Sequence, residues 1–91
     1  MSIKIKIPSI LQELTMGNDT IEVSNVANVG QVINKLEQKY PGLKAQLFDV
    51  KGNLSSIYDI YVNGESIYPH ELTTPLKDGD LIAIVMLYVG G

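Results

Sequence analysis

The sequence ends in two glycines, Gly90 and Gly91, and this end carries the residues best suited to a chemical role. Two residues without a Cβ atom form a thin thread that can enter a narrow enzyme channel. We expect the carboxylate of Gly91 to be the reactive group of the molecule. Because a carboxylate is inert until it is activated, this chemistry requires a separate enzyme that consumes a nucleotide.

The rest of the sequence lacks the residue sets on which small enzymes depend. There is no cysteine, which excludes thiol nucleophiles and thiolate metal sites. His70 is the single histidine and lacks the companions that a metal site or a catalytic triad needs. Asp78 and Asp80 flank Gly79, and turn formation explains both carboxylates. We therefore predict a protein that is not an enzyme and binds no metal or cofactor itself.

The net charge of the chain and the distribution of its charged residues indicate which kinds of partner it can bind. The chain has no arginine and a net charge of −3, which argues against nucleic acid. Residues 52–91 carry Lys77 against five acidic residues, whereas residues 1–51 carry six lysines against five acids. This acidic half either docks a basic partner or is a solvated surface. No apolar run approaches the roughly 18 residues of a membrane span. The first residues do not resemble a signal peptide, so a cytoplasmic location is expected.

One helix is predicted in the middle of the chain. Its apolar residues fall at i, i+3, i+4, i+7 and i+11, namely Val29, Val32, Ile33, Leu36 and Tyr40. Asn28 can cap this helix, Gln31 can complete a capping box, and Pro41-Gly42 ends it. Leu43, Leu47 and Val50 predict a further short helical turn.

The remaining apolar segments predict strands at residues 3–7, 20–24, 57–62 and 81–89, with a short return strand at 66–68. The last strand is apolar on both faces, which predicts a central strand covered on both sides. A right-handed crossover can pair it in parallel with the first strand. The prediction is an α+β, β-grasp (ubiquitin-like) domain: a mixed sheet of four to five strands on one main helix. Residues 1–91 form this single domain, with a flexible tail from about residue 88.

An ordered set of motifs spans nearly the whole chain: IKIKIPSIL, VGQVINKLEQKYPGL, YVNGE and LKDGDLIAIVMLYVGG. This set resembles the ubiquitin-like sulfur carriers of the ThiS/MoaD family. Residues 7–11 and 59–63 are most similar to the cysteine-biosynthesis carrier of that family. Many relatives have a proline just before Gly-Gly, and residues 86–89 contain none. That departure leaves the final partner open.

The resemblance implies a route for sulfur. An E1-like enzyme would use ATP and magnesium to convert the Gly91 carboxylate into an acyl adenylate, and a sulfur donor would displace AMP to leave a thiocarboxylate. In the cysteine version this sulfur attacks an aminoacrylate held on pyridoxal phosphate by a cysteine synthase. An S-to-N acyl shift follows, and a zinc-type metalloprotease releases the cysteine. All of these cofactors belong to partner enzymes.

The same resemblance assigns roles to positions. Gly91 carries the sulfur, and Gly90 gives clearance and flexibility. The predicted partner-binding residues are Tyr88, Val89, Leu87, Met86, Ile60 and Val62, of which Ile60, Val62 and Met86 could equally belong to the core. The partners are an E1-like adenylating enzyme and a sulfur acceptor, and the free chain is expected to be a monomer. The alternatives are the small subunit of molybdopterin synthase, a ubiquitin-like protein modifier and a plain interaction module.

Overall fold

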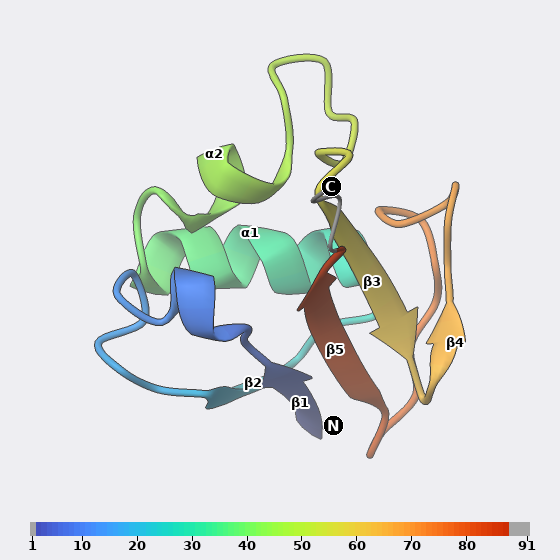
Figure 1. The fold of residues 1–91 in the computed structure, drawn as a ribbon. Helices are drawn as coiled ribbons and strands as arrows, with labels where there is room; N and C mark the ends of the chain where they lie inside the picture. The colour runs from blue at the N-terminus through green and yellow to red at the C-terminus, as the bar shows by residue number, and fades with distance from the viewer. Residues whose placement is uncertain (1, 88–91) are drawn as a thin grey trace.

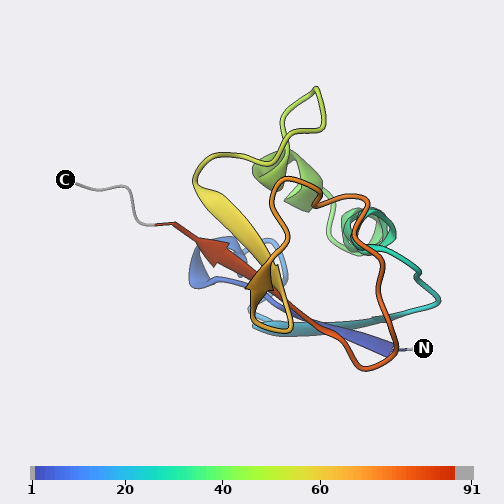
Figure 2. The same ribbon diagram turned by 90° about the vertical axis from the view of Figure 1, so that its right-hand side faces the viewer.

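The computed structural model describes residues 2–87 of the chain. Its elements, in chain order, are β1 (Ser2–Lys6), the 3₁₀ turn η1 (Ser9–Leu11), β2 (Thr20–Ser24), α1 (Val29–Lys39), α2 (Leu43–Leu47), β3 (Tyr58–Val62), β4 (Glu65–Ser66) and β5 (Leu81–Met86). The five strands form one mixed sheet, and both α-helices lie on the same side of it (Figure 1; Figure 2). This arrangement confirms the predicted β-grasp fold.

The order of strands across the sheet is β2-β1-β5-β3-β4, so β5 is central as predicted. β5 runs parallel to β1, with Ile5 opposite Ile82, and antiparallel to β3, with Ile60 opposite Ile84. β1 and β2 pair as the expected antiparallel hairpin. The alternation of isoleucine and lysine in β1 accounts for its place, since Ile3 and Ile5 are fully buried and the alternating Lys4 and Lys6 face solvent.

Helix α1 covers the sheet with its predicted apolar stripe. Val29, Val32, Ile33 and Leu36 are all buried. Asn28 caps the helix, because its side-chain Oδ1 accepts a hydrogen bond from the Gln31 N–H at 2.9 Å. In a standard capping box the Gln31 side chain would accept the N–H of the cap residue Asn28. Here it accepts the N–H of the preceding residue, Ala27, at 2.7 Å. The helix therefore begins where its sequence predicts.

Three expectations about the strands and helices were wrong. The second helix is α2, which ends at Leu47, and Val50 is fully exposed in the loop beyond it. β5 is not covered on both sides: Ile82 and Ile84 are buried under α1, whereas Leu81, Ala83 and Val85 are only half-buried. The domain has a single helical layer, so the second apolar face of β5 has no helix against it (Figure 2). β5 also ends at Met86, short of the predicted 89.

Among residues 2–87, no helix has the length and apolar character to cross a bilayer.

Candidate functional site

β5 carries the chain from the centre of the sheet to the end where the described structure stops. Met86 lies opposite Tyr58 of β3. One residue further on, the Leu87 N–H donates a hydrogen bond of 2.7 Å to the Ile57 carbonyl. This bond extends the pairing of β5 with the β3 side past the end of the strand. The backbone that leads toward Gly90 and Gly91 is thus fixed to the sheet as far as Leu87.

Exposed apolar side chains gather at this end of β5. Of the seven large apolar side chains that are exposed among residues 2–87, five belong to this region: Ile10, Ile57, Tyr68, Met86 and Leu87. Ile10 and Ile57 line one depression together with Tyr58, and Tyr68 and Leu87 line a second one that Tyr58 also borders. We call these five residues the apolar collar. An exposed apolar cluster of this kind is typical of a protein-binding surface.

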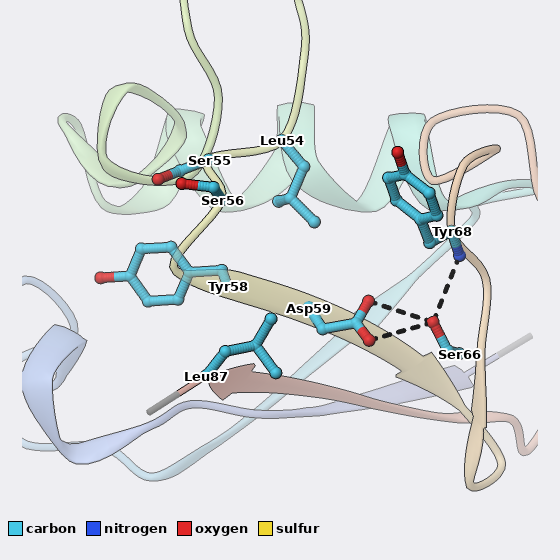
Figure 3. Close-up of a pocket in the computed structure, with 8 residues that line it drawn as sticks. All are labelled: Leu54, Ser55, Ser56, Tyr58, Asp59, Ser66, Tyr68 and Leu87. Atoms are coloured by element: carbon cyan, nitrogen blue, oxygen red, sulfur yellow. Dashed lines mark hydrogen bonds between the residues drawn. The ribbon is translucent and has the colours of Figure 1, made fainter. Parts of the chain in front are cut away.

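The second depression is a pocket of about 370 Å³ at the end of β5. Its walls include Leu54, Tyr58, Asp59, Ser66, Tyr68 and Leu87 (Figure 3). The Ser66 hydroxyl donates to the Asp59 carboxylate, at 3.1 Å from Oδ1 and 3.0 Å from Oδ2. We call this hollow the β5-end pocket. It combines apolar walls with one carboxylate beside the last described residue.

The open face of the sheet continues from this end. Its centre consists of the half-buried side chains of Leu81, Ala83 and Val85, with Tyr61 opposite Ala83 on β3. On the β1 side, Lys4 pairs with Leu81 and Lys6 pairs with Ala83. The open face is therefore apolar along β5 and basic along β1.

The turn before β5 is held by a polar clasp that fixes the start of the strand. Asn63 donates its backbone N–H to the Leu81 carbonyl at 2.8 Å, and its Oδ1 accepts the Leu81 N–H at 3.0 Å. Asp80 accepts the Lys77 N–H at 2.8 Å and the Asn63 side-chain amide at 2.9 Å. The hydrogen bond from Lys77, followed by that from Asn63, holds the pKa of Asp80 below its ordinary value. The turn role predicted for Asp80 is confirmed.

The structure separates the predicted partner-binding residues into an exposed pair, a pair packed on the core, and a pair outside the described residues. Met86 and Leu87 are exposed, at 46% and 42%, and lie in the apolar collar. Ile60 is fully buried in the core, which is the alternative that the sequence left open for it, and Val62 is half-buried against the same core. Both alternate with the outward residues of β3 and point toward the helix.

The remaining predicted site residues, Tyr88, Val89, Gly90 and Gly91, lie outside the described residues. Their roles stay predictions. Within residues 2–87, no group of three or more His, Asp or Glu side chains is placed to hold a metal ion.

Sequence reasoning missed Ile10 and Ile57, whereas Tyr68 belongs to a group of late tyrosines that the sequence leaves open as either packing or partner-binding residues. Ile10 lies beside buried Leu11 in η1, and Ile57 precedes buried Tyr58. In each of these adjacent apolar pairs, one residue is buried in the core and the other is exposed. Ile10 has no place in a predicted helix or strand, and that was the available signal for it. The sequence carries no sign that the three residues meet at one end of the sheet.

Comparison with known proteins places the whole chain among related folds. The model of the ThiS family matches residues 5–91. A chain in the crystal structure of the Amycolatopsis orientalis BexX/CysO complex is 30% identical, with a TM-score of 0.86, over 98% of this chain and 99% of that one. Mycobacterium tuberculosis CysO is 31% identical, with a TM-score of 0.85, over 94% of this chain and 99% of that one.

A third similar structure is the small archaeal modifier protein 1 of Methanosarcina acetivorans. It is 33% identical, with a TM-score of 0.78, over 99% of this chain and 96% of that one. Among curated protein sequences, none matches this chain significantly.

Proposed function

This chain belongs to the ThiS family of ubiquitin-like sulfur carriers, and we propose that it carries sulfur as a thiocarboxylate on Gly91. The observation that carries the proposal is the family match itself, which extends to residue 91 and so includes the Gly-Gly pair. The route of β5 supports it, because the strand carries the chain out of the core as far as Leu87, the last described residue before that pair.

The proposed chemistry takes place in two steps on a partner enzyme. A carboxylate oxygen of Gly91 attacks the α-phosphate of ATP, and pyrophosphate leaves, so that an acyl adenylate forms. A hydrosulfide-type sulfur then attacks the Gly91 carbonyl carbon, and AMP leaves with the bonding electron pair. The product is a thiocarboxylate, and no oxidation or reduction is required. In this proposal the chain acts as a protein co-substrate, not as a catalyst.

The described residues supply docking surfaces for this chemistry. The apolar collar surrounds the point where the chain leaves the sheet, so an enzyme that takes Gly91 into its channel meets Met86 and Leu87 at the channel mouth. The apolar strip of Leu81, Ala83 and Val85 on the open face offers further area. Binding energy from these remote surfaces can position the Gly91 carboxylate for attack.

We assign the sulfur to cysteine biosynthesis as the first candidate pathway. The two CysO chains, at 30% and 31% identity over nearly their full length, support this choice. The partners in this proposal are an E1-like adenylating enzyme and a cysteine synthase that accepts the sulfur. BexX, which forms a complex with the Amycolatopsis CysO, shows that such a relative assembles with another protein.

A second candidate function is protein modification. The small archaeal modifier protein 1 of Methanosarcina acetivorans is 33% identical to this chain. A modifier would use the same activated Gly91, but its carbonyl carbon would be attacked by the ε-amine of a lysine on another protein.

Intact-mass spectrometry of the protein isolated from its native cell tests these proposals. A carrier shows a mass gain equal to the exchange of one carboxyl oxygen for one sulfur, and a modifier shows conjugates at lysine. A terminus that stays unmodified while the cell needs sulfur for cysteine would overturn both. Deletion of Gly91 is the control, because it removes the proposed carbonyl and should abolish either product.

A further inference from the structure

The β5-end pocket has a chemical character that sulfur chemistry at Gly91 does not require. Leu87, the last described residue, forms part of its wall. Any enzyme that receives residues 88–91 therefore passes alongside this pocket. The side chains that line the pocket determine which group of such an enzyme can bind there.

Among the described residues that line the pocket, Asp59 supplies the one charged group. Its hydrogen-bond donors in the described structure are uncharged: the Ser66 hydroxyl and the backbone N–H of Ile60, which lies 2.8 Å from Oδ1. An ionised carboxylate has about four lone-pair sites, so these contacts leave acceptor capacity in the pocket. Ser66 also contacts both oxygens and thereby orients the carboxylate (Figure 3).

The walls around this carboxylate combine aliphatic and aromatic side chains with the hydroxyl groups of Ser55, Ser56 and Ser66. Leu54 and Leu87 approach it from opposite sides, and the ring of Tyr68 stands at one edge (Figure 3). Tyr68 is 74% exposed, so its ring face is available to an incoming group. A carboxylate between aliphatic walls and an aromatic face suits a side chain with an apolar stem and a planar cationic head.

We propose that the β5-end pocket receives an arginine side chain from the enzyme that activates Gly91. The guanidinium head would bond both oxygens of Asp59 in the bidentate manner that lysine cannot reproduce, and it would stack on Tyr68. Its stem would lie against Leu54 and Leu87. This inference rests on the proposed function, because it requires an enzyme that takes up residues 88–91.

The charge distribution of the chain supports a basic occupant. From residue 52 onward, five acidic residues are opposed by Lys77 alone. Such a field attracts a positively charged surface and speeds its association. Asp59 is the member of this set that lines the pocket, whereas Asp78 and Asp80 lie in the turn at the other end of β5. The acidic half therefore favours a basic partner at long range, and Asp59 supplies the attraction at contact.

The test compares two variants with the same change of charge. Asp59→Asn keeps the shape of the side chain and an acceptor for Ser66 but removes the charge. Glu65→Gln removes one charge from an exposed residue of β4 that does not line the pocket. Dissociation constants for the activating enzyme are measured by titration calorimetry at low and high salt. We expect Asp59→Asn to weaken binding about tenfold at low salt and to reduce the salt dependence, and Glu65→Gln to change binding less than about threefold.

A double-mutant cycle then identifies the occupant. Each surface arginine and lysine of the activating enzyme is replaced by alanine and combined with Asp59→Asn. Coupling of about fivefold or more to one arginine confirms the inference. Coupling to a lysine, or equal effects of the two carrier variants, would overturn it. Loss of binding by Asp59→Asn without coupling to any enzyme residue would also overturn it, and would indicate that the pocket holds a segment of this chain.

The same experiment separates the inference from the function on which it rests. If the enzyme binds the wild type and Asp59→Asn with equal affinity and activates Gly91 of both, the proposed arginine contact is wrong and the carrier function stands. If the wild type itself is neither bound nor activated, both proposals fail.

Discussion

At the scale of single residues, the functional demand falls on Gly90, next to the proposed reactive carboxylate. A side chain here would widen the thread that an activating enzyme must accept. We predict that Gly90→Ala slows loading of Gly91 by roughly tenfold or more, since small displacements of a reacting group are costly. Loading is measured as ATP–pyrophosphate exchange with the activating enzyme. The melting temperature should not change, and a normal rate of loading would contradict the role assigned to Gly90.

Asp80 is a residue whose charge stabilises the turn before β5. Its pKa in the folded protein lies below the ordinary value of 3.8, because the Lys77 N–H and the Asn63 amide bind the charged form. The stabilisation is therefore present above about pH 3.8 and is lost as the pH falls through the folded pKa. Since the carboxylate is exposed to solvent, we expect a contribution of about 0.5 kcal/mol or less.

The corresponding variant is Asp80→Asn, studied by urea unfolding between about pH 2 and pH 7. We predict that the variant is slightly less stable than the wild type near pH 7 and that the difference disappears near pH 2. Glu13→Gln is the control, because it removes one charge from an exposed side chain elsewhere. A difference that persists or grows in acid would show that the hydrogen bonds from Lys77 and Asn63 do not act through the charge of Asp80.

At the scale of elements, the start of α1 depends on close contact with the loop before β5. The Gly30 N–H donates to the Leu72 carbonyl at 3.0 Å, and a Cβ atom on Gly30 would lie 2.6 Å from that same oxygen. The neighbouring Val29 N–H donates to the Thr74 carbonyl at 3.0 Å. Two of the N–H groups at the start of the helix are thus satisfied by this loop.

We predict that Gly30→Ala destabilises the fold by about 1–2 kcal/mol, although alanine is the better helix former. The added methyl group can be accommodated only if the backbone of Leu72 moves away from the helix. Chemical denaturation gives the change in free energy of unfolding. Gln38→Ala, at an exposed position of α1, should change it by about 0.5 kcal/mol or less. Equal stability of the two variants would show that the loop around Leu72 can move to accommodate the methyl group at no cost in free energy.

At the scale of the whole molecule, the apolar collar is assembled from segments that are far apart in the sequence. Ile10 comes from η1, Ile57 precedes β3, Tyr68 follows β4, Met86 ends β5 and Leu87 follows it. The collar lies at the end of the central strand, so the fold concentrates exposed apolar side chains where the described chain leaves the sheet. This placement ties partner binding to the position of the reactive end.

Leu87→Asp tests the collar against a matched control. Leu87 is 42% exposed, and Val50 is a fully exposed apolar residue at the tip of another loop. We predict that Leu87→Asp weakens binding to the activating enzyme about tenfold or more, because the charge must be buried at the interface. Val50→Asp should leave binding within about twofold. Both variants should keep the wild-type circular dichroism spectrum. Equal binding by the two variants would remove the collar from the docking surface.

The sequence by itself determined the elements and their order. Helix α1 was predictable because its stripe and its Asn28 cap are local patterns, and β1 because isoleucine and lysine alternate along it. The central, parallel place of β5 followed from its apolar character and from the crossover through α1. The chemistry proposed for Gly91 also came from the sequence, since it depends on residue type at the end of the chain.

Only the tertiary structure decided which apolar residues are buried. Ile60 and Met86 look equivalent in the sequence, yet Ile60 lies under the helix and Met86 lies beyond its reach. The open face of β5 was mistaken for a buried one, because an apolar pattern does not state how many layers will cover a strand. The collar and the β5-end pocket were likewise hidden. They exist because the fold brings together segments that lie far apart in the sequence, such as Ile10 and Leu87, and no local periodicity acts over that separation.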